Sequence, residues 1–344
     1  METRDKRKSS QLRYIQELED RLQGGERAEL ELEYCKKQVA EFWRARDGRK
    51  ERAGGNGRAA SRYLPDNRFA DRERAWVERI KLALAREEFK IYYQPIVQGE
   101  EKLEITWVEA LLHWPSPDLG MIYPDKFIPA AEKSGLILPL GEWVLSTACA
   151  QVRDWQRAGH CRLKLAVNVS PLELEQEDFV ARVERILAER DFDPQKLILE
   201  VTESVAVGDF AFLAENLSAL REMGIGIALD DIGTRCSSLE WVKKLPANIL
   251  KIDPAFVLDI EEDAGSKAIV AALLDMAAAL GLEVVAEGVA SSRKLELLHK
   301  LGCRFFQGNL FSPPVPAGDF APLLGGLPPA DIKGILAVMR SGRK

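Results

Sequence analysis

The segments LKLAVNVS (163–170), LILEVTES (197–204) and GIALDD (226–231) are short apolar runs that end in polar residues. Five similar runs complete a series: FKIYYQPI (89–96), EITWVEALL (104–112), ILKID (249–253), LEVVAEG (282–288) and CRFFQG (303–308). Helical patterns lie between the runs, at 178–190, 210–223, 266–280 and 293–301. Strands that alternate with helices indicate an α/β fold with a largely parallel sheet. Eight runs in this length favour a (β/α)8-type barrel over an open sheet, and the glycine-rich dinucleotide fingerprint follows none of them.

The rest of the 344-residue chain differs in composition from this series. Residues 1–60 carry 15 Lys and Arg against 12 Asp and Glu. Apolar residues at Leu12, Ile15, Leu18 and Leu22 give one face to a helix within 11–43, which is typical of a short coiled coil or of a solvated helical tail. We therefore expect four parts: a charged helical N-terminal region (1–60), a linker and lead-in helix (61–84), the barrel (85–322) and a C-terminal tail (323–344).

Composition excludes several classes of function. The formal net charge is −6, from 48 Lys and Arg against 54 Asp and Glu, which argues against a nucleic acid polymer as partner. The most apolar stretch, 268–282, is too short for a membrane span and contains Asp275. The charged N-terminus has no secretory pattern, and the five cysteines are scattered without a CxxC pair. These features predict a cytoplasmic protein without a membrane span.

Polar side chains stand where the predicted strands end. They are Glu109, Asn168, Glu200, Asp230, Asp231, Lys251, Glu287 and Gln307. In a barrel of parallel strands such residues meet around the mouth at the C-terminal face, where barrel active sites lie. A single acid at a strand end is more often a helix cap or a solvated loop residue. Because polar residues stand at seven predicted strand ends at once, a shared site is favoured.

Five carboxylates in one mouth require compensation. At about 4 Å and an effective dielectric of about 20, each like-charge pair costs roughly 4 kcal/mol. Cations must offset that cost, or several carboxyl groups must hold protons. Carboxylate and amide oxygens suit Mg²⁺ or Mn²⁺ better than Zn²⁺, and the three histidines form no HExxH pattern. Two such ions could clamp the attacking and leaving oxygens of a phosphodiester, while Lys251 orients water or neutralises phosphate charge.

Nine motifs from about 85 to 322 closely resemble the EAL-domain cyclic-di-GMP phosphodiesterases. They are YYQPIV (92–97), EALLHW (109–114), PDKFIPAAEKSGLI (124–137), VNVS (167–170), LEVTES (199–204), DDIGT (230–234), LKID (250–253), AEGVA (286–290) and QGNLFS (307–312). The resemblance implies a modified TIM barrel that hydrolyses cyclic di-GMP to linear pGpG. It also implies two Mg²⁺ or Mn²⁺ ions and inhibition by Ca²⁺. The helix within 11–43 predicts self-association, hence a homodimer, and is the natural contact for an upstream sensor or partner.

The resemblance assigns roles to individual residues. It implies metal ligation or its immediate support by Glu109, Asn168, Glu200, Asp230, Asp231 and Glu287. Catalytic roles fall to Lys251 as the water-positioning lysine, to Glu287, and to Glu203, which braces the loop after Asp231. Substrate-binding roles fall to Gln94, Leu111, His113, Asp253 and Gln307.

Four departures from the family pattern keep a second interpretation open. His113 replaces the arginine that contacts the ligand phosphate, and histidine is shorter and carries less charge. Ile232 and Arg235 alter the loop written DDFGTG in the family; Ala290 and Asn309 replace a glutamate and a tyrosine. The leading hypothesis is a metal-dependent cyclic-di-GMP phosphodiesterase. The alternative is a catalytically weak or inactive domain that acts as a cyclic-di-GMP receptor or protein-interaction module; action on another phosphodiester or on pGpG is a minor third.

Overall fold

The computed structural model describes residues 67–99, 102–202, 210–232 and 239–326, with the side chains of 67–73, 231–232 and 239–241 left undescribed. All of them belong to the second of two units into which the chain divides, Asp66–Lys344. The predicted N-terminal helix at 11–43 lies outside these ranges, as do Glu203, Arg235 and most of the predicted tail.

Within the described residues, eight strands close into a barrel. They are β1 (Lys90–Gly99), β2 (Leu103–Ser116), β4 (Lys164–Val169), β5 (Leu197–Thr202), β6 (Gly226–Ile232), β7 (Ile249–Ile252), β8 (Glu283–Ala286) and β9 (Phe305–Gln307). The short strands β3 (Gly120–Ile122) and β10 (Val315–Pro316) extend the sheet at β2 and β1. Pairing of β1 with both β2 and β9 closes the ring. All eight runs expected from the sequence are strands, and the predicted barrel is confirmed.

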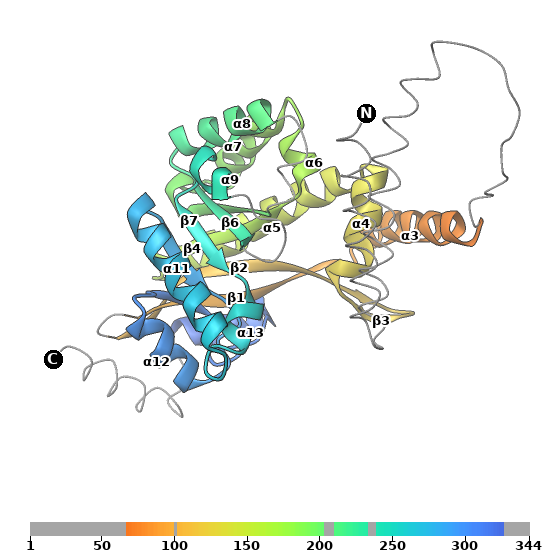
Figure 1. Cartoon of the computed structure of the whole chain (residues 1–344). Coiled ribbons are helices and arrows are strands. Elements are labelled where there is room, and N and C mark those ends of the chain that lie inside the picture. Colours follow the sequence, from red (N-terminus) through yellow and green to blue (C-terminus); the bar gives the residue numbers. More distant parts are fainter. Residues whose placement is uncertain (1–66, 100–101, 203–209, 233–238, 327–344) are drawn as a thin grey trace, which may run out of the picture. The chain divides into compact units, whose positions relative to one another are not determined.

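Helices follow most of the strands and cover the barrel from outside (Figure 1). They are α5 (Ile137–Arg157), α6 (Pro171–Leu174), α7 (Phe179–Glu189), α8 (Phe210–Glu222), α9 (Leu239–Lys244), α10 (Pro254–Leu258), α11 (Ala264–Leu280), α12 (Ser292–Lys300) and α13 (Ala317–Leu324), with a 3-10 turn, η1, at Pro194–Lys196. The four predicted helical stretches agree with α7, α8, α11 and α12 within two residues. No helix in the described part of the chain is both long and apolar enough to cross a membrane.

The first strand departs from the parallel arrangement. β1 is antiparallel to β2 and to β9, whereas every pairing from β2 through β4 and onward to β9 is parallel. Three residues join β1 to β2, and a parallel connection needs a dozen or more. The N-terminal half of β1 therefore lies at the rim where the other strands end.

An apolar layer fills the barrel interior below that rim. One residue from each of the eight strands contributes: Ile96, Trp107, Ala166, Ile198, Ala228, Ile249, Val285 and Phe305. All are buried, and the Trp107 and Phe305 rings stack with their centroids 4.5 Å apart. We call this layer the floor. Side chains of opposite strand parity, such as Leu165 and Leu199, pack outward against the helices in the main core.

A second core lies beyond the barrel rim, where β1 and β2 continue as a two-stranded ribbon. Helices α3 (Asn67–Ala85) and α4 (Pro124–Ser134) cover one face of this ribbon (Figure 1). Trp114 at the centre is 2% exposed. Its ring centroid lies 5.1 Å from that of Phe89 and 6.0 Å from that of Trp76 on α3. The Trp114 Nε1–H donates to Glu88 Oε2 at 2.8 Å. These contacts join the predicted lead-in helix to the strand that carries Glu109.

Candidate active site

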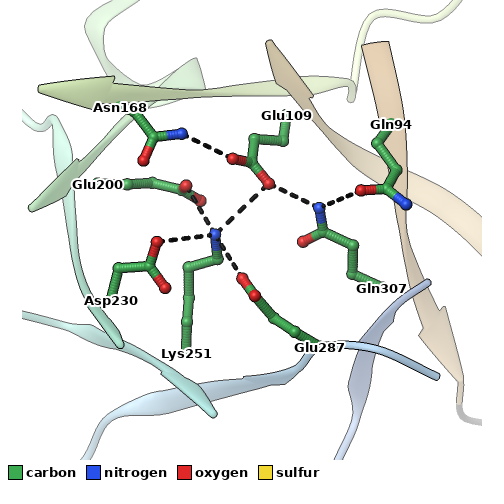
Figure 2. Close-up of polar contacts among 8 residues, drawn as sticks. All are labelled: Gln94, Glu109, Asn168, Glu200, Asp230, Lys251, Glu287 and Gln307. Atoms are coloured by element: carbon green, nitrogen blue, oxygen red, sulfur yellow. Dashed lines mark hydrogen bonds and ion pairs between the residues drawn. The ribbon is translucent and has the colours of Figure 1, made fainter. Parts of the chain in front are cut away.

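Eight polar side chains form a ring directly above the floor. Each lies two residues from the floor residue of its own strand, towards the mouth, so the period-two alternation of a β-strand places all eight on the inner face. They are Gln94, Glu109, Asn168, Glu200, Asp230, Lys251, Glu287 and Gln307, drawn together in Figure 2. We call them the polar ring. Every one of them is among the residues assigned to the site from the sequence.

Lys251 lies at the centre of the polar ring. Its ammonium nitrogen is 2.6 Å from Glu287 Oε1 and 2.7 Å from Glu200 Oε2. It is 3.5 Å from Glu109 Oε2 and from Asp230 Oδ2 (Figure 2). The lysine side chain is 2% exposed, and it is the longest polar side chain in a layer that is otherwise acid and amide. The four carboxyl groups therefore point at one buried cation.

Amide groups fix the orientation of Glu109. Asn168 donates to Glu109 Oε1 at 2.7 Å, and Gln307 donates to Glu109 Oε2 at 2.6 Å. Gln307 also donates to Gln94 Oε1 at 2.9 Å, and Gln94 donates to the Ser312 carbonyl at 3.2 Å. Both oxygens of Glu109 are thus held by amide hydrogen bonds from two other strands, β4 and β9.

Burial and neighbouring charges shift the pKa values of the carboxyl groups in the polar ring in different directions. Burial raises the pKa of Glu200 well above its usual range, and the neighbouring Glu109 charge adds to this rise. Burial also raises the pKa of Glu287, to about 8. Burial pushes the pKa of Glu109 upwards too, but the Lys251 charge and the hydrogen bond from Gln307 outweigh it, so the pKa is lowered. The cost of crowded carboxylates is therefore met by proton uptake as well as by a cation.

Lys251 itself stays charged. Burial alone would lower the pKa of the ammonium, but the surrounding carboxylates, Glu109 and Glu200 foremost, raise it well above the usual value. A lysine in this state cannot accept a proton near neutral pH, so its contribution is electrostatic. The sequence-based proposal that Lys251 neutralises phosphate charge stays a prediction; the carboxyl groups of the ring are its partners in this structure.

Two glycines hold the backbone beside the ring. Gly308 follows Gln307 and has a φ of +155°. A Cβ at Gly308 would lie 2.3 Å from the Val289 carbonyl oxygen. A Cβ on Gly288, next to Glu287, would lie 2.8 Å from Pro254 Cβ, with φ at +68°. No other residue type fits these approaches without moving the backbone, so both glycines support the positions of the adjacent ring residues.

The other residues assigned from the sequence lie elsewhere. Leu111 and His113 follow Glu109 on β2, beyond the rim. Asp253 caps α10, with its carboxylate accepting from the Ala255 amide at 2.6 Å, and it forms no hydrogen bond or ion pair with the polar ring among the described residues. Asp231 lies in β6 but its side chain is outside the described residues, and Glu203 is outside them altogether.

The ring offers oxygen ligands of the kind that bind hard divalent cations. Four carboxyl groups and the Asn168 amide face one volume, and the buried Gln307 Oε1 lacks a hydrogen-bond partner among the described residues. As they stand, however, no three acidic, histidine or cysteine side chains of the described ranges are placed to ligate one ion. The carboxyl groups converge on the ammonium instead. A cation would enter by displacing Lys251 from one or more of them.

Comparison with known proteins identifies relatives of this barrel. Residues 77–314 match the model of the EAL domain. Over 238 residues the chain is 43% identical to the Pseudomonas aeruginosa protein named bifunctional diguanylate cyclase/cyclic di-GMP phosphodiesterase MucR. That match covers 69% of this chain and 35% of the relative. The cyclic di-GMP phosphodiesterase NbdA of the same organism is 37% identical over 247 residues, which cover 72% of this chain and 31% of the relative.

A solved structure extends the comparison to three dimensions. The PaMucR phosphodiesterase in its c-di-GMP complex superposes with a TM-score of 0.68 at 41% identity, covering 72% of this chain and 99% of that chain. The chain spans about a third of the length of the curated relatives it matches. The similarity therefore concerns the barrel, and the other parts of those longer proteins lie outside the match.

Proposed function

Because the chain belongs to the EAL domain family, we propose that it is a metal-dependent phosphodiesterase that hydrolyses cyclic di-GMP to linear pGpG. One observation carries the proposal: four carboxyl groups and an asparagine amide converge around the buried Lys251 ammonium in the barrel mouth. The names of MucR and NbdA, and the c-di-GMP complex of the solved relative, support the choice of substrate.

The polar ring supplies the ligands that such a reaction requires. In this proposal two Mg²⁺ or Mn²⁺ ions would be held by Glu109, Asn168, Glu200, Asp230, Asp231 and Glu287, and Ca²⁺ would inhibit by taking their place. When bound, two such ions polarise the phosphodiester and make bound water a stronger nucleophile near neutral pH. Among the chain's own residues, Gln307 and Asn168 hold Glu109. Glu203, outside the described residues, keeps the loop-bracing role that the family resemblance implies.

Lys251 acts in this proposal as a movable positive charge. Its ammonium is paired with carboxyl groups in the structure; where those groups held a cation instead, it would be free to face the phosphate or the attacking water. The floor residues exclude water from below and fix the height of the ring in the mouth. Glu287, whose Oε1 lies 2.6 Å from the Lys251 ammonium, is assigned a catalytic role beside that lysine.

The test is a turnover assay with a matched pair of variants on β2. Purified chain is incubated with cyclic di-GMP and Mn²⁺, and pGpG is separated and quantified. Glu109→Gln keeps the shape of the ring while removing one negative charge, and we expect a loss of at least about 100-fold, as for removal of one essential electrostatic group. Glu104→Gln, on an exposed side chain of the same strand, should leave turnover unchanged. Wild-type product no greater than that of Glu109→Gln would reject the proposal.

A second candidate function is a cyclic-di-GMP receptor with little or no turnover. His113 on the rim favours it, since this residue replaces the family's arginine next to the ligand phosphate. Calorimetry in Ca²⁺ distinguishes the two functions: tight binding together with absent turnover in Mn²⁺ supports the receptor. Absence of both binding and turnover would leave the interaction module.

The remaining assignments concern the whole protein and are also proposals. They are a homodimer, an upstream sensor or partner reached through residues 1–60, the four-part division of the chain, and a cytoplasmic location. The free thiols of Cys149, Cys161 and Cys303 are consistent with a reducing compartment. The contacts of α3 with Trp114 support the lead-in helix as the route by which an N-terminal signal reaches β2.

A further inference from the structure

His113 lies on the inner face of the ribbon that rises above the polar ring. On β2 it follows Glu109 by four residues, so strand alternation gives both side chains the same face. Its cross-strand partner on β1 is Lys90, and Tyr92, the next residue of the same parity, is paired with Leu111. A ligand that reaches the ring from the mouth passes this face.

The imidazole is held on three sides. The Tyr92 ring stacks on it with centroids 4.2 Å apart and an interplanar angle of 27°. Tyr123, which is 57% exposed, contacts the imidazole edge-on, with ring centroids 5.9 Å apart and an interplanar angle of 71°. Nδ1 lies 3.1 Å from the Leu111 carbonyl oxygen. Two rings and one hydrogen bond thus fix both the plane and the rotation of His113.

The hydrogen bond decides which nitrogen carries the proton. A carbonyl oxygen can only accept, so Nδ1 must be the donor, and in the neutral ring Nε2 then has a free lone pair. No hydrogen bond to Nε2 is seen among the described residues, and the side chain is half-buried. The neutral ring therefore offers an acceptor to a ligand. A phosphate oxygen, which also accepts, is not a partner for it.

We propose that His113 determines specificity by accepting, through Nε2, a hydrogen bond from the base edge or the ribose of the substrate. This inference rests on the proposed function. Cyclic di-GMP offers three kinds of donor: the guanine N1–H, the guanine 2-amino group and the ribose 2′-hydroxyl. In this role His113 does not substitute for an arginine at the phosphate. It recognises an uncharged part of the ligand, the guanine edge or the ribose hydroxyl.

The test combines protein variants with ligand analogues in a binding assay. Dissociation constants are measured by calorimetry with Ca²⁺ at pH 8 for cyclic di-GMP and three analogues. Cyclic di-IMP lacks the 2-amino group, the N1-methyl analogue lacks the imino hydrogen, and the 2′-deoxy analogue lacks the hydroxyls. His113→Phe keeps a ring against Tyr92 without a polar atom, and His113→Gln retains an acceptor. His160→Phe, in the loop before β4 at the opposite end of the barrel, is the matched control.

We expect the wild type to bind one analogue roughly 3- to 10-fold more weakly than cyclic di-GMP, the range for one neutral hydrogen bond. His113→Phe should lose that preference and His113→Gln should retain part of it, while His160→Phe behaves as the wild type. Equal weakening of all four ligands in His113→Phe, or an unchanged preference, would overturn the inference. A wild type that neither binds nor hydrolyses cyclic di-GMP would instead overturn the proposed function.

Discussion

The Lys251 ammonium nitrogen lies 2.7 Å from Glu200 Oε2, and each of the two side chains is 2% exposed. The same ammonium lies 3.5 Å from Glu109, whose pKa is lowered, so removal of Lys251 leaves a buried charge uncompensated, which typically costs about 3–5 kcal/mol. We expect Lys251→Met to lower the free energy of unfolding by about this amount and to abolish turnover. Urea unfolding at pH 7 and the product assay measure the two effects.

Lys164→Met provides the control for that variant. Lys164 begins β4 at the other end of the barrel, where its ammonium lies 5.2 Å from the Trp107 ring centroid. Its loss should cost about 1 kcal/mol or less and leave turnover intact. A Lys251→Met protein as stable as Lys164→Met would mean that the ring does not depend on its central cation.

The packing of the floor leads to a second prediction, which concerns stability and turnover together. Ala228 is fully buried between larger floor residues, and Asp230 stands two residues further along β6. Ala228→Leu should therefore cost about 1–3 kcal/mol by overpacking and lower kcat/KM by displacing Asp230. Ala268→Leu, on the exposed side of α11, should change neither quantity. Normal turnover in Ala228→Leu would contradict the idea that the floor sets the position of the ring.

Glu173 predicts a pH dependence of stability away from the ring. This glutamate, at the start of α6, accepts from the Ser170 amide at 3.1 Å, and burial raises its pKa to about 7. Between about pH 4.5 and pH 7 the folded state binds more protons than the unfolded chain, so the free energy of unfolding falls as pH rises. The fall attributable to Glu173 is at most about 3 kcal/mol.

Glu173→Gln should therefore flatten the decline in stability between pH 5 and pH 8. Glutamine keeps an oxygen acceptor for the Ser170 amide but has no proton to lose. Urea unfolding at several pH values gives the measurement, with Glu175→Gln, an exposed neighbour, as the control. If both variants follow the wild-type curve, Glu173 is ionised at no cost in the folded state.

Gly308 predicts a steric requirement beside Gln307. Its Cα hydrogen faces the Val289 backbone so closely that a methyl group requires the chain to move. Gly308→Ala should lower stability by about 1–3 kcal/mol and weaken turnover, because Gln307 holds Glu109. Gly318→Ala, at a position with nothing within 4 Å, should stay within about 0.5 kcal/mol of the wild type. Equal stability of both variants would contradict this account of Gly308.

The fold was largely predictable because seven of the eight barrel strands are short apolar runs that lead to a polar residue. The direction of β1 was not, since hydrophobic pattern is the same for either direction and only the three-residue connection to β2 carries that information. The reversal also explains why a search at strand ends misses Gln94, which precedes its floor residue Ile96. Gln94 was assigned through the family resemblance alone.

The electrostatics of the ring were predictable in kind but not in detail. Crowding of carboxylates indicated cations or protonation; the structure places the Lys251 cation among the acids, and burial raises the pKa of Glu200 and Glu287. That Lys251 lies central among the acids depends on the relative heights of neighbouring strands, which no local pattern encodes. The stacking of Tyr92 on His113 likewise depends on the β1–β2 register.

The central claim, that the polar ring is a metal-dependent active site, is tested most directly by locating Mn²⁺ in crystals of the protein through its anomalous scattering. The account predicts Mn²⁺ within about 2.0–2.6 Å of carboxylate oxygens of Glu109, Glu200 or Asp230, with the Lys251 ammonium displaced from at least one carboxyl group. Crystals saturated with Mn²⁺ that hold no ion at the ring, and in which Lys251 keeps all four contacts, would contradict it.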